Sequence, residues 1–309
     1  MIIQWYPGHI AKAERELKEQ LKRVDVVLEV RDARIPLATH HPQTTQWVGD
    51  KTRLLVLNRV DMINSAVQQL WDGWFQQQGE IPYLTNAQQG QGVRRVIQAA
   101  QQAGVVVNQR RKSRGMQPRP VRAVVIGFPN VGKSALINRL LGRRVVASAR
   151  RAGVTRQLRW IRISDQIELL DAPGVIPAQL KNQEDAIKLA ICDDIGEASY
   201  DNQQVAAALV ELLKKLEAIE AVAPALTAIP TKAIPTKDIL PKFALERRYE
   251  LDPTSLTGEE YLQALAVSRY QGNLERTARQ MLNDFRKGLL GAIALELPPT
   301  LSSFHPNTL

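Results

Sequence analysis

One eight-residue segment, 127–134, constrains the fold of this chain more than any other feature. It reads Gly-Phe-Pro-Asn-Val-Gly-Lys-Ser and fits the phosphate-loop pattern G-x-x-x-x-G-K-[ST]. An apolar run at 121–127 leads into it, and a helical pattern at 133–141 follows it and stops at Gly142. In this strand, loop and helix order, backbone N–H groups and the helix N-terminus face a bound phosphate. The segment therefore predicts a nucleotide site at the edge of an α/β sheet that has helices on both faces.

Each part of this segment has an expected role with a nucleoside triphosphate. Lys133 would bridge the β- and γ-phosphates, and Ser134 would ligate Mg²⁺. A D-x-x-G tetrapeptide, Asp171 to Gly174, ends a second apolar run at 166–170. Asp171 would hold Mg²⁺ through water, and the Gly174 N–H would sense the γ-phosphate. Thr155 lies between the two elements and could complete the Mg²⁺ shell; the alternative is an ordinary surface threonine.

A third motif precedes the phosphate loop in the chain. Asn58-Arg59-Val60-Asp61 follows an apolar run at 53–57 and looks like the N-[KR]-x-D element with which GTPases read guanine. The Asp61 carboxylate can accept two hydrogen bonds from guanine N1–H and N2–H₂, a pair that adenine does not offer. Thr85-Asn86-Ala87, after a short strand, could supply a backbone N–H to the guanine oxygen. The alternative is an ordinary strand-to-helix loop in which Asp61 caps a helix.

Composition describes an ordinary globular chain with a strong positive charge. Its 309 residues are 44% hydrophobic and carry a net charge of +10, which favours a polyanionic partner. No Asp or Glu occurs from Ile81 to Ser164, and over so long a stretch nucleic acid is a better explanation than a solvated surface. No apolar run is long enough to span a membrane, and Cys192 is the only cysteine. We expect a cytoplasmic location.

The hydrophobic patterns predict two domains, 1–178 and 179–309. In the first we expect helices at about 10–23, 63–78 and 92–103, strands at 26–30, 53–57 and 81–84, a flexible linker from Asn108 to Pro120, and a strand hairpin at 159–170. In the second we expect only helices, at 183–196, 202–220, 257–270 and 274–290. A proline-containing insert at about 221–241, which duplicates Ala-Ile-Pro-Thr-Lys, interrupts them.

Taken together, these motifs resemble the circularly permuted GTPases of ribosome assembly, and most closely the ribosome biogenesis GTPase A family. The resemblance includes the opening Trp5 to Ala13, the Asp32-Ala33-Arg34-Ile35-Pro36 loop and the permuted order of the motifs. It implies a P-loop GTPase domain with permuted motif order, followed by a smaller all-α C-terminal domain that contacts ribosomal RNA. It also implies GTP hydrolysis to GDP coupled to late maturation of the large (50S) subunit, with Mg²⁺ as cofactor. Subunit precursors, rRNA and ribosomal proteins are the expected partners of a monomeric protein without membrane contacts.

The resemblance implies a set of nucleotide contacts and three further roles. Val175 stands where many GTPases have a water-orienting Gln, so we expect slow unaided turnover, and His9 could orient the water; the alternative for His9 is a helix-start residue. Asn130 could help hold a K⁺ ion beside the phosphates. Arg59 and Asn86 depart from the usual Lys and Ser. The expected nucleotide-binding residues are Asn58, Arg59, Asp61, Asn86, Ala87, Pro129, Asn130, Val131, Gly132, Lys133, Ser134, Ala135, Thr155 and Gly174.

In the C-terminal domain, basic side chains would contact RNA, and solvated helix faces are the alternative. The residues expected there are Lys242, Arg247, Arg248, Arg269, Arg276, Arg279, Arg286 and Lys287. Three other functions remain open: a GTPase of tRNA modification or general translation, a nucleotide-gated RNA-binding scaffold that barely hydrolyses, and a P-loop ATPase.

Overall fold

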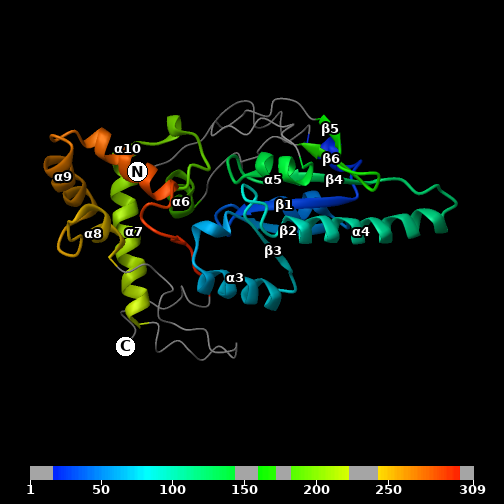
Figure 1. Ribbon diagram of the computed structural model, residues 1–309, viewed down its shortest axis with the longest axis horizontal. Coiled ribbons are helices and arrows are strands. Elements are labelled where there is room, and N and C mark those ends of the chain that lie inside the picture. The colour runs from blue at the N-terminus through cyan, green and yellow to red at the C-terminus, as the bar shows by residue number, and fades with distance from the viewer. Residues whose placement is uncertain (1–16, 143–158, 172–181, 223–242, 300–309) are drawn as a thin grey trace. The chain divides into compact units, whose positions relative to one another are not determined.

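A computed structural model describes residues 17–142, 159–171, 182–222 and 243–299 (Figure 1). His9, Thr155, Gly174 and nearly all of the 221–241 insert lie outside these ranges. The described chain forms two units. The sheet unit comprises residues 17–60, 80–142 and 159–171, and the helical unit comprises residues 61–79, 182–222 and 243–299.

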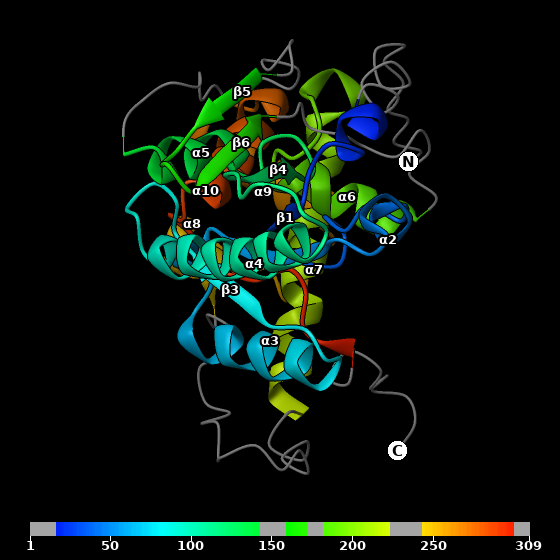
Figure 2. The same ribbon diagram turned by 90° about the vertical axis from the view of Figure 1, so that its right-hand side faces the viewer.

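The sheet unit contains a six-stranded sheet in the order β3-β2-β1-β4-β6-β5. Every neighbouring pair is parallel except β5 and β6, which form an antiparallel hairpin at one edge (Figures 1 and 2). All seven residues of β1 are buried, as expected for a central strand with both faces covered. The strands are β1 (Val26–Asp32), β2 (Thr52–Asn58), β3 (Pro82–Thr85), β4 (Val121–Ile126), β5 (Arg159–Arg162) and β6 (Ile167–Asp171).

Strand order reverses direction between β1 and β4. From β1 the chain builds outward through β2 to β3; on the other side of β4 it runs first to the edge strand β5 and then returns to β6, the neighbour of β4. In open α/β sheets, ligands bind beyond the carboxyl ends of the strands at such a reversal. The segment that follows β4 is the phosphate loop, so the fold puts the predicted nucleotide loop at the position that this rule favours.

Helices cover both faces of the sheet, as predicted. On one face, α4 (Val93–Ser113) packs through its buried Val96, Ala100 and Ala103. At Gly104 a Cβ atom would lie 3.1 Å from the Val121 side chain, so glycine allows the helix to approach β4 closely. On the other face, a helix that ends at Leu21 and α2 (Thr44–Val48) form a core with Val27, Val124 and Ile126. The remaining helix of this unit is α5 (Lys133–Leu140).

The helical unit contains helices and two short 3₁₀ turns. In it α7 packs against α9 and α10. Thr257 begins α9 with a capping box, in which its side chain accepts from the Glu260 N–H while Glu260 accepts from the Thr257 N–H, as the sequence predicted. Its elements are α3 (Ser65–Gln77), α6 (Gln183–Ile191), η2 (Glu197–Ser199), α7 (Asn202–Val222), α8 (Ala244–Tyr249), α9 (Gly258–Arg269) and α10 (Leu274–Arg286), with η1 (Val60–Met62) at its first boundary.

Four expectations differ from the structure. The helix expected at 92–103 continues to Ser113, so residues 108–113 are not a flexible linker. The helix expected at 183–196 ends at Ile191, where Cys192 caps it and Asp193 adopts a positive φ of 65°. The helix expected at 274–290 ends at Arg286, before the left-handed Gly288. Residues 61–79 group with the helical unit rather than with the 1–178 domain, and Met62 lies close to Gly288 there.

Arg286 is not the surface cation that the sequence predicted. Its guanidinium donates to the carbonyls of Ala190 and Ile191 at 2.8 and 3.0 Å and to the Tyr200 hydroxyl at 2.7 Å. Its side chain is only 11% exposed, so it serves the packing of α10 against the end of α6. Among the described residues, no helix is long and apolar enough to cross a membrane.

Candidate nucleotide-binding site

The carboxyl ends of the central strands align at one edge of the sheet. Asp32 of β1 pairs with Asn58 of β2, and Asn58 pairs with Thr85 of β3. Because these residues share a register row, their side chains emerge on the same face of the sheet. The phosphate loop begins directly after β4, the neighbour of β1 on the other side. Three predicted elements therefore converge on this edge from distant parts of the chain.

Two glycines fix the path of the phosphate loop. Gly127 has a φ of 148°, and a Cβ atom there would lie 2.3 Å from the Val30 carbonyl oxygen. Gly132 has a φ of 98° and caps the N-terminus of α5. Any other residue at either position would be strained and would clash, so the loop keeps bare backbone at its two ends. Bare backbone leading into a helix N-terminus fits a phosphate group, because N–H groups can approach its oxygens.

The first turn of α5 carries the expected phosphate and metal residues. Lys133 opens the helix, and its Nζ donates to the Phe128 carbonyl at 2.6 Å across the loop. Ser134 and Ala135 follow it and are partly exposed. Asp171 is the last residue of β6 and pairs with Val125 of β4, so its backbone lies one strand away from the phosphate loop.

Asn58 connects the predicted guanine element to the phosphate loop. Its Nδ2 donates to the Val131 carbonyl at 2.9 Å, and its Oδ1 accepts from the Ala87 N–H at 3.0 Å and the Thr85 hydroxyl at 3.1 Å. Asn58 is buried, so all three bonds form away from water. One side chain thus joins the ends of β2 and β3 to the loop after β4.

This bond explains why position 132 must be glycine. A Cβ atom on Gly132 would lie 2.1 Å from the Asn58 Nδ2 atom. The Asn58 side chain and the backbone of the 127–134 loop therefore pack closely against each other.

Arg59 makes a second link to the same loop. It adopts a positive φ of 65°, and its guanidinium donates to the Asp32 carboxylate at 2.9 Å and to the Asn130 carbonyl. Asn130 also has a positive φ, 57°. Non-glycine residues rarely adopt this conformation, and paired instances occur where the surroundings enforce them. Here the Arg59 guanidinium joins the two strained positions.

Asp32 is the acid that holds Arg59. It is fully buried and also forms a bidentate pair with Arg34, at 2.8 and 3.0 Å. Burial alone would raise the pKa of Asp32, but Arg34 and Arg59 outweigh it and hold the pKa below its usual value. Asp32 therefore stays ionised at neutral pH and keeps Arg59 beside the phosphate loop.

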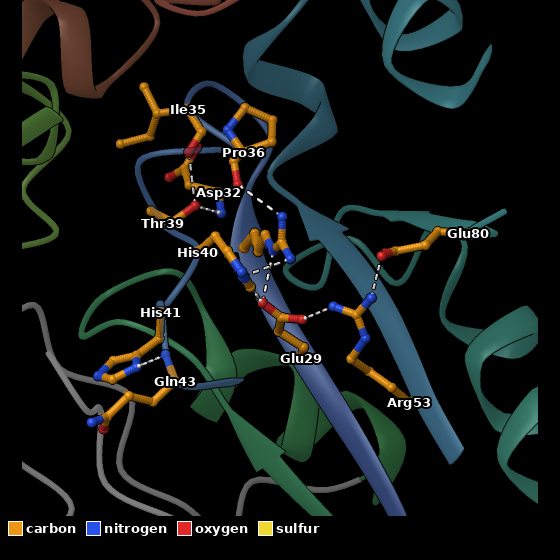
Figure 3. Close-up of polar contacts among 11 residues, drawn as sticks. Glu29, Asp32, Ile35, Pro36, Thr39, His40, His41, Gln43, Arg53 and Glu80 are labelled. Carbon is orange, nitrogen blue, oxygen red and sulfur yellow. Dashed lines mark hydrogen bonds and ion pairs between the residues drawn. The ribbon is translucent and has the colours of Figure 1, made fainter. Parts of the chain in front are cut away.

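The loop after β1 is fastened by polar contacts (Figure 3). The Thr39 hydroxyl donates to the Ile35 carbonyl at 2.8 Å and accepts from the Asp32 N–H at 3.1 Å. Arg31 donates to Glu29 at 2.8 Å and to the Pro36 carbonyl at 3.4 Å. The loop that carries Asp32 is thus held at both of its ends.

Glu29 is the acid at the centre of that network. It is 2% exposed and contacts Arg31, His40 and Arg53, while Arg53 also binds Glu80 (Figure 3). Burial alone would raise the pKa of Glu29, but the hydrogen bond with His40 and the charge of Arg31 lower it well below its usual range. Glu29 is therefore an ionised side chain inside the sheet.

The segment after β3 forms a tight turn around Asn86. Its Oδ1 accepts from the N–H groups of Gln88 and Gln89, both at 3.1 Å. Arg139 of α5 donates to the carbonyls of Ala87 and Gln88. Asn86, which departs from the usual serine, thus shapes the turn that orients the Ala87 backbone.

Several predicted positions are not joined to this edge by the described contacts. Asp61 is exposed in η1 and begins the helical unit. His9, Thr155 and Gly174 lie outside the described residues, and of Asp171 only the backbone is described. Within the described ranges, no group of three His, Cys, Asp or Glu side chains forms a metal cluster.

Three residues at the site had no role assigned from the sequence: Asp32, Thr85 and Arg139. Asp32 had a signal, because an acid directly after a buried strand is a candidate site residue. Thr85 belongs to a motif from which the sequence predicts only a backbone contact. Arg139 gave no signal, since its contact with Ala87 depends on how α5 packs.

Comparison with known proteins gives a consistent result. Residues 122–230 match the sequence model of a family described as 50S ribosome-binding GTPase. The chain is 32% identical over 304 residues to ribosome biogenesis GTPase A of Bacillus cereus, an alignment that covers 96% of this chain and 95% of that protein. It is 31% identical over 304 residues to ribosome biogenesis GTPase A of Bacillus pumilus, covering 96% and 99%.

The fold also has a solved counterpart. The structure is similar to the crystal structure of GNP-bound YlqF from T. maritima, with a TM-score of 0.59 and 21% sequence identity. The match covers 93% of this chain and 99% of that chain, so it includes both the strands and the C-terminal helices.

Proposed function

This chain belongs to the ribosome biogenesis GTPase A family, and from that premise we propose that it couples GTP hydrolysis to late maturation of the large ribosomal subunit by binding ribosomal RNA. As a member of the family it is a GTPase that acts in ribosome biogenesis. The expected place of such a protein is the cytoplasm, where it would meet precursors of the large subunit and their RNA and proteins.

The observation that carries this proposal is the bond between Asn58 and the Val131 carbonyl. This bond supports the proposal because it joins the segment that we expect to read the base directly to the loop that we expect to hold the phosphates. We assign guanine recognition to Asn58, Asp61 and the Ala87 backbone, and phosphate binding to the loop up to Ser134. Arg59 would support these contacts by binding the Asn130 backbone, and Asn86 by shaping the turn after β3.

The residues at the phosphate end have distinct proposed tasks. Lys133 would leave the Phe128 carbonyl to neutralise the β- and γ-phosphates. Ser134, Thr155 and Asp171 would hold Mg²⁺, which when bound offsets the charge of the phosphate oxygens. Gly174 would contact the γ-phosphate through its N–H. The permissive backbone at Gly127 and Gly132 is the feature of this structure that suits such a ligand.

Hydrolysis needs a group that orients water, and Val175 has none. We assign that role to His9, because an imidazole accepts a hydrogen bond from water near neutral pH. Asn130 would help hold K⁺, which would offset charge that develops between the β- and γ-phosphates. Turnover in KCl should exceed turnover in NaCl at equal ionic strength; equal rates would remove K⁺ from the mechanism.

The C-terminal helices are the proposed RNA-binding domain. The exposed side chains of Arg247, Arg276 and Lys287 are its best-placed cations. Arg248, by contrast, pairs at 2.7 Å with the fully buried Asp284. Because the chain runs from Gly174 into these helices within a few residues, loss of the γ-phosphate would be transmitted to RNA binding.

The experiment that tests the proposal measures GTP turnover with and without purified large subunits. We expect slow turnover alone and at least ten-fold faster turnover with 50S particles, together with GTP-dependent cosedimentation. Equal stimulation by 30S particles or tRNA would favour a role in translation or tRNA modification. Binding without any stimulation would favour a nucleotide-gated scaffold, and equal competition by ATP would favour an ATPase.

A further inference from the structure

The second half of α4 and the segment after it form a structured projection from the sheet unit. No residue of α4 after Gly104 is buried. Residues 105–113 of the helix, roughly 13 Å at 1.5 Å per residue, therefore continue beyond the packed part. Figure 1 shows this part of α4 running past the strands before the chain turns back toward β4. We call residues 105–120 the α4 hairpin.

The α4 hairpin is held by hydrogen bonds along its length. The Asn108 side chain exchanges two bonds with the Arg119 backbone, at 2.9 and 3.1 Å. Arg111 Nε donates to the Gln117 carbonyl at 3.1 Å, and the Met116 N–H donates to the Arg111 carbonyl at 3.0 Å. The segment that returns from the tip is thus held against the last turns of the helix.

An ion pair between Arg119 and Asp25 fixes the base of the hairpin to the sheet. Arg119 donates two hydrogen bonds to Asp25, at 2.8 and 3.0 Å, and the same carboxylate accepts from the Arg122 N–H at 2.9 Å. Asp25 directly precedes β1, so the base of the hairpin is tied to the centre of the sheet. The tip is consequently presented in a defined position.

The tip carries a cluster of basic side chains without acids. Arg110, Lys112 and Arg114 are exposed, and within the described part of the chain none of them forms an ion pair. Arg119, Arg122 and Arg162 of the same unit do have acidic partners. Basic residues in a last helical turn also offset the helix dipole, but that effect needs no more than one or two of them. The surplus charge is available to an external anion.

We propose that the α4 hairpin is an RNA-binding surface that contacts the phosphate backbone of double-helical RNA. This surface is separate from the C-terminal helices and belongs to the unit that contains the phosphate loop. The stretch from Ile81 to Ser164 has no acid, so nothing near it in sequence repels a polyanion.

The composition of the hairpin selects backbone contact over base contact. Residues 105–120 contain no aromatic side chain on which an unpaired base could stack. Arg110 lies in the last turn of α4, and Arg114 caps the end of the helix four residues later, so both charges lie at the same end of the helix. Arginine pairs well with phosphate through its planar guanidinium. A rigid, basic, non-aromatic projection suits a duplex, whose phosphates are regularly spaced.

The test compares two pairs of substitutions at the two ends of α4. Arg110→Gln with Arg114→Gln removes two charges from the tip, and Arg94→Gln with Arg95→Gln removes two from the other end of α4. All four side chains are exposed, so both variants should fold, and each lowers the net charge of +10 by two. The full-length protein is titrated onto a 20-base-pair RNA duplex, followed by fluorescence anisotropy at several salt concentrations.

We expect the tip variant to lose about ten-fold or more in affinity at 0.1 M salt. The slope of log K against log salt should fall by roughly 1.4 to 1.8, the loss of two phosphate contacts. The control pair should change affinity less than about two-fold, and intrinsic GTP turnover should not change in either variant. Equal losses in both variants would show only a bulk charge effect, and no loss in the tip variant would overturn the proposal.

A preference for single-stranded RNA of the same length would also contradict it. If the tip variant binds duplex normally but no longer binds an acidic ribosomal protein, the surface is a protein contact and the proposal is wrong. No ribosome is present in the duplex assay, so its result does not depend on whether large subunits stimulate GTP turnover.

Discussion

The side-chain amide of Asn58 donates a 2.9 Å hydrogen bond to the backbone carbonyl of Val131, 73 residues further along the chain. The same side chain accepts from Thr85 and Ala87, so the ends of two strands and the phosphate loop share one buried amide. In the proposed site, the segment that reads the base and the loop that binds the phosphates are therefore linked by a donor and an acceptor on a single residue.

Asn58→Asp separates these two roles. The substituted carboxylate keeps the acceptor for the Ala87 N–H but loses the donor to Val131 and places two oxygens opposite each other. An unmade buried hydrogen bond costs about 1–3 kcal/mol, so GDP affinity should fall about 10- to 100-fold. Fluorescent GDP binding measures this. Gln77→Glu, the same amide-to-carboxylate change at an exposed position of α3, is the control; equal affinities of wild type and Asn58→Asp would refute the coupling.

Arg59 and Asp32 should act as one unit. Asp32→Asn removes the acid that holds the Arg59 guanidinium, and Arg59→Lys removes the fork that reaches both Asp32 and Asn130. In a double-mutant cycle on GDP affinity, we expect a coupling energy of about 0.5–3 kcal/mol. Additive effects would mean that the Asp32–Arg59 pair does not support the loop.

Asp61→Asn should exchange base specificity. The amide would donate where guanine also donates, whereas xanthine offers an acceptor at that position. We expect GTP affinity to fall roughly 100-fold while xanthosine triphosphate affinity rises. Competition assays with both nucleotides measure the change, and Asp50→Asn, at an exposed position, is the matched control. Unaltered discrimination would exclude Asp61 from the base pocket.

Glu29→Gln should change stability and its dependence on pH. The pKa of Glu29 is lower in the folded protein than in the unfolded chain, so its stabilisation is complete above the unfolded value of about 4.3 and is lost as pH falls below it. Removing the charge leaves Arg31 and Arg53 without their shared partner, at a cost of about 3–5 kcal/mol at pH 7.

Urea unfolding at pH 7 and pH 3.5 measures both effects. The wild type should lose more stability than Glu29→Gln between these pH values, since only in the wild type does the unfolded chain take up a proton at this position that the folded protein does not. Identical pH profiles would show that the Glu29 network does not contribute to acid sensitivity. Glu19→Gln, at an exposed pair with Lys22, should shift stability by less than about 0.5 kcal/mol.

His9→Ala tests the proposed water-orienting group. GTP affinity should remain within about two-fold, while turnover stimulated by large subunits falls about 100-fold or more. Single-turnover hydrolysis with and without 50S particles separates binding from chemistry. Normal stimulated turnover in the variant would exclude His9 from catalysis.

The sequence predicts the strands and the order of the motifs because both are local. The strand and phosphate loop can be recognised from about a dozen consecutive residues, and the capping box at Thr257 from four. The permuted arrangement follows from the order alone. These features did not need a partner elsewhere in the chain.

What the sequence did not reveal depends on distant partners. Asn108 to Pro120 has no hydrophobic periodicity, yet arginine, lysine and glutamine are good helix formers, and Asp25 anchors Arg119 from 94 residues away. Glu29 sits in an apolar run, and its pairing with Arg53 requires the register of β1 and β2. The short α2 and the bond from Arg139 to Ala87 likewise depend on packing.

The neighbouring strands β1 and β4 are where the two halves of the sheet, β1 to β3 and β4 to β6, meet. At the amino end of this pair the Asp25 and Arg122 backbones meet through a 2.7 Å hydrogen bond and Asp25 also binds Arg119, while beyond its carboxyl end Arg59 joins Asp32 to Asn130. Hydrogen bonds at both ends of the β1–β4 pair oppose separation of the two halves of the sheet. We therefore expect nucleotide to exchange by rearrangement of the loops above the strands, with the two halves of the sheet staying joined through every turnover cycle.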